Sequence, residues 1–147
     1  MKPLPQDIFY EKPEFAVCWY DKELEAIVQE FETVTYWTPE LIETYKQMQD
    51  AMLQALSRYH ATKWLCLAGK WVRATPPEVQ KWIEQVVAPG VIERGLKYFA
   101  EVMPGSAITR FSTQKWQEGV QTVIRGQMTL ANFSTEQEAR AWLQQQQ

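Results

Sequence analysis

The sequence predicts an α/β fold, with a mixed, mostly parallel sheet of about four to six strands, an N-terminal antiparallel hairpin and about four flanking helices. Two observations lead to this prediction. Near the N-terminus, two strand-like runs are separated only by the polar residues Asp21-Lys22-Glu23, which is a hairpin spacing. Further along, stretches with helical periodicity alternate with short apolar runs, as the crossovers between parallel strands require.

The hairpin is expected in residues 15–35, with arms at 15–20 and 24–35 that are rich in β-branched and aromatic residues. Residues 1–14 precede it as an N-terminal arm or an edge strand, and the run Ile8-Phe9-Tyr10 is compatible with the strand. Residues 15–147 are long enough for one well-buried domain and too short for two, so a single domain is expected.

The first helix is expected to begin after Thr38. Its hydroxyl can cap the helix, Pro39 suits the first helical position and Glu40 suits the positive end of the helix dipole. Apolar side chains then recur at three- and four-residue steps over about five turns. They are Leu41, Tyr45, Met48, Met52, Leu56 and Tyr59.

Strands are expected next at 64–68, 96–103 and 128–133, each followed by helical sequence. The helix after the first of these should begin with a capping box at Thr75 and Glu78, bend or restart at Pro89, and end at Gly95.

Cap residues also mark the later helices. Ser106 is expected to cap one short helix, and Ser112 or Thr113 to cap another. A closing helix should follow Ser134 and bury Ala139.

Charge and composition disfavour several classes of function. With 15 basic and 18 acidic residues and a net charge of −3, the chain lacks the basic face that nucleic acid requires. No apolar run approaches the roughly 20 residues that span a bilayer, and the N-terminal sequence lacks the pattern of a secretion signal. A cytoplasmic protein with no membrane span is expected, and Cys18 and Cys66 are expected to be buried thiols.

The sequence shows no recognisable catalytic or metal-binding motif. His60, the single histidine, has no orienting acid or nucleophile beside it in the sequence. Closely spaced metal ligands and glycine-rich phosphate loops are also missing. We therefore expect no metal, no cofactor and no enzymatic activity.

Candidate binding residues gather where the central strands end, because open α/β sheets bind ligands at the carboxyl ends of their strands. They are Lys70, Trp71, Arg73 and Thr75 after one strand, and Ser106 and Arg110 after the next. Two helix N-termini, cations and an exposed tryptophan can hold an anion or an acidic peptide there. The alternative is an ordinary polar loop in which Thr75 is only a helix cap.

Aromatic and sulfur-containing side chains provide further candidates. The chain has seven tryptophans, and Trp19 and Trp37 are candidate anchors for a partner, although Trp37 can instead pack against the start of the first helix. Met48 and Met52 are candidates for lining an apolar ligand pocket, although filling the core is the commoner role.

The strand-helix-strand run from Leu24 to Leu67, the segment TPPEVQKWIEQVVAPGVIERGLKYFAEVMPG and the closing NFSTEQEARAWL together resemble the STAS or SpoIIAA-like domain family. The resemblance is strongest to the small stand-alone bacterial proteins grouped with STAS/CRAL-TRIO, and it implies a mixed sheet flanked by helices with a binding or regulatory role. In the anti-sigma-factor antagonists of this superfamily, a Ser or Thr at the start of a helix is phosphorylated. Thr75 is the matching position, but the Asp-Ser-Ser/Thr-Gly type of loop is replaced by residues 69–74 and two prolines.

The expected function is a non-enzymatic regulatory or protein-interaction domain. It would bind a protein partner, or itself as a homodimer, through aromatic surface residues. The alternative is a carrier or sensor for a small apolar or amphipathic, lipid-like ligand held between the long helix and the sheet.

Overall fold

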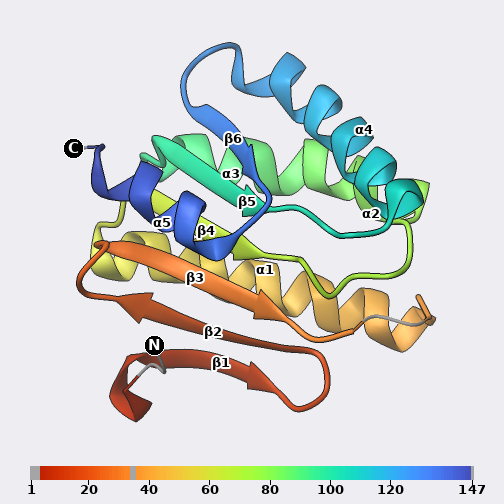
Figure 1. Ribbon diagram of the computed structural model, residues 1–147, viewed down its shortest axis with the longest axis horizontal. Helices are drawn as coiled ribbons and strands as arrows, with labels where there is room; N and C mark the ends of the chain where they lie inside the picture. Colours follow the sequence, from red (N-terminus) through yellow and green to blue (C-terminus); the bar gives the residue numbers. More distant parts are fainter. Residues whose placement is uncertain (1–3, 34–35, 147) are drawn as a thin grey trace.

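A computed structural model describes residues 4–33 and 36–146. It contains a six-stranded sheet in the order β1-β2-β3-β4-β5-β6, with helices on both faces (Figure 1). The strands are β1 (Ile8–Lys12), β2 (Ala16–Asp21), β3 (Ala26–Phe31), β4 (Lys63–Leu67), β5 (Tyr98–Val102) and β6 (Thr129–Phe133). The strands β1 to β3 pair antiparallel and β3 to β6 pair parallel, which confirms the predicted α/β class with an N-terminal hairpin.

The helices follow the strands along the chain. They are α1 (Pro39–Tyr59), α2 (Pro77–Trp82), the π-helical turn η2 (Ile83–Val87), α3 (Ala88–Glu93), α4 (Ala107–Ile124) and α5 (Glu136–Gln144), with a 3-10 turn η1 (Pro5–Asp7) before β1. Each parallel strand lies beside its predecessor, and such crossovers are right-handed. Consequently α1, α2–α3 and α4 lie on one face of the sheet, whereas α5 lies on the other (Figure 1).

Alternate residues of each strand enter opposite halves of the core. In β3, Ile27 and Phe31 pack in the cluster under α1, whereas Ala26 and Val28 pack in the cluster under α5. The register also aligns Gln29, Cys66, Glu101 and Asn132 in one row across β3 to β6. Gln29 and Glu101 are buried, so the row brings polar side chains beneath the helices.

The hairpin is shorter than the sequence suggests. Leu24 and Glu25 belong to the connection before β3, where Glu25 has a left-handed φ of 56°. The predicted end of the second arm includes residues 34–35, which lie outside the described residues, and Thr33 is not in a strand. Within residues 1–14, Ile8–Lys12 form β1, which pairs antiparallel with β2 as an edge strand.

At Pro89 the helix changes type rather than ending: α2 is followed by the π-helical turn, and α3 begins at Ala88 with Pro89 in its first turn, which agrees with the predicted restart. The backbone N–H of Ala88 donates to the carbonyl of Ile83, five residues earlier, in a π-helical turn. Proline has no N–H and its ring crowds the carbonyl four residues back, so a wider turn accommodates it. The helix therefore continues from Pro77 to Glu93, and Gly95 follows with a φ of 86°, in line with the predicted stop.

The two short helices expected after Ser106 are a single helix, α4. Ser106 is its N-cap, with Oγ accepting from the N–H of Thr109 at 3.4 Å. Ser112 and Thr113 are buried inside the helix, where the Thr113 hydroxyl donates to the carbonyl of Thr109. These hydroxyls resemble caps in the sequence but form internal and tertiary hydrogen bonds.

The helix α5 covers the face of the sheet opposite the other helices. Ala139 and Leu143 are completely buried against it, and Arg140 bridges Asp21 of β2 and Glu136 at 2.7 Å each. Both cysteines are buried free thiols, as predicted. In residues 4–33 and 36–146, no helix is long and apolar enough to cross a membrane.

Candidate functional site

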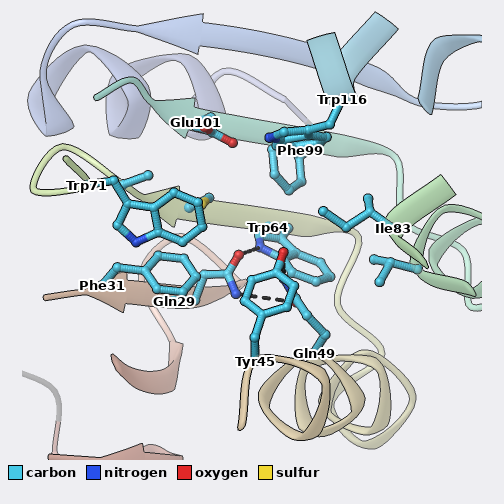
Figure 2. Close-up of a pocket in the computed structure, with 13 residues that line it drawn as sticks. Gln29, Phe31, Tyr45, Gln49, Trp64, Trp71, Ile83, Phe99, Glu101 and Trp116 are labelled. Atoms are coloured by element: carbon cyan, nitrogen blue, oxygen red, sulfur yellow. Dashed lines mark hydrogen bonds between the residues drawn. The ribbon is translucent and has the colours of Figure 1, made fainter. Parts of the chain in front are cut away.

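A cavity of about 50 Å³ lies between the sheet and the helices on the α1 side (Figure 2). Its walls come from β3, β4 and β5, from α1, from the π-helical turn and from α4. The lining residues are Gln29, Phe31, Tyr45, Gln49, Trp64, Cys66, Ala68, Trp71, Ile83, Val87, Phe99, Glu101 and Trp116. The strand residues among them alternate in sequence because alternate side chains face the same side of a sheet.

A second cavity of about 30 Å³ adjoins the first. The two share Trp64, Ile83, Val87, Phe99 and Trp116 in their walls. The remaining walls of the second cavity are apolar and consist of Ala88, Val91, Leu96, Val120, Met128 and Leu130. The space under the helices therefore has a polar end beside β3 and β5 and an apolar end beside α3 and α4.

The carboxyl group of Glu101 is the main polar group of the first cavity. The residue is 2% exposed, and its Oε1 atom has no hydrogen-bond partner among the described residues. Burial raises the pKa of Glu101 to about 8, and a hydrogen bond with the Cys66 side chain lowers it in part. Burial also raises the pKa of Cys66 and Tyr45, and no Lys, Arg or His is among the lining residues.

A chain of hydrogen bonds fixes the wall opposite Glu101 (Figure 2). Trp64 Nε1 donates to Gln29 Oε1 at 2.9 Å, and Gln29 Nε2 donates to Gln49 Oε1 at 3.5 Å. Gln49 Nε2 in turn donates to the Tyr45 hydroxyl at 2.8 Å. This network joins β4, β3 and α1, so these side chains are held in place before any ligand arrives.

Aromatic rings close the cavity beyond the end of β4. Trp71 packs edge-on against Phe31 at 4.7 Å and against Trp37 at 5.6 Å between ring centroids, and Trp37 packs edge-on against Tyr45 at 5.6 Å. Among the described residues, the indole N–H groups of Trp37 and Trp71 have no hydrogen-bond partner. The prediction that Trp71 is exposed is wrong, because this aromatic cluster buries it.

The other predicted rim residues do not form one site. The exposed Lys70 pairs with Glu32 at 3.2 Å, and the guanidinium of Arg73 lies 5.5 Å from the ring centroid of Tyr36. Ser106 caps α4, and Arg110 Nε donates to the carbonyl of Pro104 at 3.3 Å. Arg110 borders a separate surface groove of about 230 Å³ with Met103, Gly105, Gln114, Asn132, Phe133 and Ser134.

Thr75 does not cap a helix. The N-cap of α2 is Pro76, because the second proline, Pro77, occupies the first helical position. Thr75 is 3% exposed, its N–H donates to Ser112 Oγ at 2.9 Å, and its own hydroxyl has no partner among the described residues. The predicted capping box is therefore wrong, and the Thr75 hydroxyl is inaccessible to a modifying enzyme in this conformation.

The other sequence candidates lie in the core rather than at a site. Trp19, predicted as an exposed anchor, is 4% exposed and packs in the cluster under α5. Trp37 is partly buried against the core. Met48 and Met52 are fully buried and absent from the lining of both cavities, although Met48 Sδ accepts from Gln29 Nε2 at 3.9 Å.

Sequence reasoning missed Glu101, Gln29 and Gln49. The available signal was a polar residue inside an apolar stretch, as in Tyr98–Val102 and Ala26–Phe31. Among the described residues, no group of three or more His, Cys, Asp or Glu side chains is arranged to hold a metal ion. Comparison of the chain with protein-family models, with curated protein sequences and with solved structures found no match.

Proposed function

We propose that this protein binds a small molecule in the cavity beneath α1, as a carrier or sensor that catalyses no reaction. The observation that carries the proposal is the buried Oε1 atom of Glu101, which borders the cavity without a hydrogen-bond partner among the described residues. Buried polar atoms are normally paired, and leaving one unpaired costs about 1–3 kcal/mol. A bound molecule that donates to this oxygen would recover that free energy.

The composition of the walls supports binding more than catalysis. Most of the lining is aromatic or aliphatic with a few fixed polar groups, which is typical of small-molecule sites. The nucleophilic side chain in the lining, Cys66, has a pKa raised well above its ordinary value, so its thiol is a poor nucleophile at neutral pH.

A protein-interaction domain of SpoIIAA-like type remains the second candidate. The burial of Trp19 and Trp71 removes two of the aromatic anchors expected for it. The exposed apolar residues Ile108 and Phe111 of α4, 75% and 61% exposed, favour it. Analytical ultracentrifugation of the wild type and of an Ile108→Ser, Phe111→Ser double variant tests whether these residues join two copies of the chain. A dimer that is lost in the variant would support this second candidate.

Native mass spectrometry of gently purified protein tests small-molecule binding. The matched variants are Ile83→Phe, which fills the space shared by both cavities, and Val86→Phe, which introduces the same side chain at an exposed position of the same π-helical turn. We expect a retained or added small molecule on the wild type and on Val86→Phe, and its loss from Ile83→Phe. Bare chain mass in all three, with and without small-molecule mixtures, would count against the proposal.

A further inference from the structure

In the part of the chain that the structure describes, the lining of the cavity contains ionisable groups that can become negative and none that can become positive. Its ionisable lining groups are Glu101, Cys66 and Tyr45, and each of these becomes negative or stays neutral. Six aromatic rings accompany them, from Phe31, Tyr45, Trp64, Trp71, Phe99 and Trp116. An acidic group surrounded by aromatic rings attracts cations and opposes anions.

Building on the proposed binding function, we propose that the ligand is a small organic ammonium ion with a short alkyl chain. Its charged head lies between Glu101 and the aromatic walls, and its chain enters the adjoining apolar cavity. The ammonium N–H groups donate to Glu101 Oε1, the atom that lacks a partner among the described residues. No Lys, Arg or His of the described residues lines the cavity, so the positive charge of the ligand takes the place of a side-chain cation beside the Glu101 carboxylate.

The aromatic residues can contact such a cation from several directions. Figure 2 shows Glu101 reaching toward the cavity from β5, with Phe31 on β3, Trp71 on the loop after β4 and Tyr45 on α1. A cation within about 6 Å of a ring centroid is attracted by the face of the ring. The hydrogen-bond network through Gln29 and Gln49 keeps this wall rigid. Binding therefore costs little side-chain conformational entropy there.

The size of the space limits the ligand. A water-sized group needs roughly 10–15 Å³ of such volume, so the cavity of about 50 Å³ holds a head of only a few non-hydrogen atoms. The adjoining cavity of about 30 Å³ adds room for a short run of carbons. Short alkylammonium ions that keep an N–H donor fit, whereas a long-chain lipid does not.

Binding of a cation should be linked to proton release. Glu101 is protonated at neutral pH in the free protein because its pKa is about 8, and an ammonium ion favours the carboxylate. The titratable groups that interact with Glu101 are Cys66 from β4 and Tyr45 from α1, and burial keeps both neutral in this pH range. Affinity for the cation should therefore rise by up to about tenfold per pH unit below pH 8 and level off above it.

Isothermal titration calorimetry with n-propylammonium, tetramethylammonium, propionate, n-propanol and potassium chloride tests the ligand class. We expect n-propylammonium to bind, with one proton released per ion when buffers of different ionisation enthalpy are compared below about pH 8. Tetramethylammonium carries the same charge but has no N–H to donate to Glu101 Oε1, so it should bind more weakly. Propionate, which matches n-propylammonium in size but carries the opposite charge, should not bind. Glu101→Gln should lower affinity for the cations at least tenfold and abolish the pH dependence.

Each other outcome has a defined meaning. Binding of propanol or propionate as strongly as n-propylammonium overturns the cation proposal but leaves small-molecule binding in place. Binding of potassium with no effect of the organic cations overturns it as well. If no probe binds and native mass spectra show only bare chain, both this inference and the proposed function fail. If Glu101→Gln does not fold, the wild-type proton release and the propionate comparison still decide between these outcomes.

Discussion

Glu101 should make the stability of the protein depend on pH. Its pKa is about 8 in the folded chain against an ordinary value of 4.5, so between these values the folded state binds more protons than the unfolded state. The free energy of unfolding then falls as pH rises, by up to about 1.4 kcal/mol per pH unit, and the decline ends above the folded pKa. Urea unfolding of the wild type and of Glu101→Gln at a series of pH values between about 4.5 and 8 measures this decline in the free energy of unfolding.

The comparison with Glu101→Gln isolates this one group. The buried thiol of Cys66 and the hydroxyl of Tyr45 titrate in both proteins, so their effects cancel in the difference. The wild type should lose stability relative to the variant until about pH 8, after which the difference stays constant. A difference independent of pH throughout would contradict the raised pKa of Glu101.

Gln29 should contribute to stability through its hydrogen bonds rather than its volume. Gln29→Leu leaves the buried Trp64 Nε1–H without its acceptor at 2.9 Å and breaks the link to Gln49. Leaving such buried groups unpaired should cost about 1–3 kcal/mol of unfolding free energy. Chemical denaturation measures this loss.

Gln54→Leu is the matched control for the Gln29 substitution. Gln54 also donates a side-chain hydrogen bond, to Asp50 at 3.0 Å, but that bond is exposed to water. Substitutions at such positions usually change stability by less than about 0.5 kcal/mol. Equal effects of the two substitutions would show that the buried network contributes nothing specific.

The starts of helices α1 and α2 provide a test at the level of elements. Both begin with a Thr-Pro sequence, yet Thr38 Oγ1 accepts from the Leu41 N–H at 3.1 Å, whereas the Thr75 hydroxyl has no partner among the described residues. Thr38→Val should therefore cost about 0.5–2 kcal/mol of unfolding free energy through loss of the cap. Thr75→Val should be neutral or stabilising, because it replaces a buried hydroxyl with a methyl group of similar shape.

Thermal and urea unfolding of the two threonine variants decide between the sequence interpretation and the structure. A capping box at Thr75 would make both substitutions destabilising by similar amounts. The structure predicts a clear difference, because Pro77 moves the helix start beyond the reach of the Thr75 side chain.

Local chemistry predicted most elements but not how their ends combine. The cap at Thr38 and the apolar periodicity of α1 were sufficient to locate that helix. The continuous α4 could not be predicted from Ser112 and Thr113, because their hydroxyls can cap a helix or lie within one, and tertiary packing decides. Pro89 was ambiguous in the same way, since a π-helical turn and a break both accommodate a proline.

At the scale of the molecule, the fold class followed from the order of the elements, whereas the site did not. A cavity is the space left when many side chains pack, so its lining depends on strand register and helix position. Trp71 was predicted to be an exposed binding residue, but it is buried and lines the cavity. Glu101 and Gln29 become neighbours of the same cavity only when β3, β4 and β5 align them in one row.

The two-sided sheet requires α5 for stability. A chain ending after residue 133 leaves Leu65 and Val102 of the sheet without the cover of Ala139 and Leu143. Full burial of one leucine-sized side chain contributes roughly 1.5–3 kcal/mol, so this truncation should abolish cooperative unfolding. Circular dichroism during heating measures it, and a chain ending after residue 144 should unfold like the full chain.

The sequential order of the sheet has a consequence for how the chain reaches its structure. Each strand pairs with the strand that precedes it in the sequence, so no strand has to insert between two others that are already paired. During synthesis from the N-terminus, the sheet can therefore grow at one edge, with each new strand finding its neighbour already made. The helix α5 emerges after all six strands, and until it does, one apolar face of the growing sheet stays open to chaperones and to aggregation.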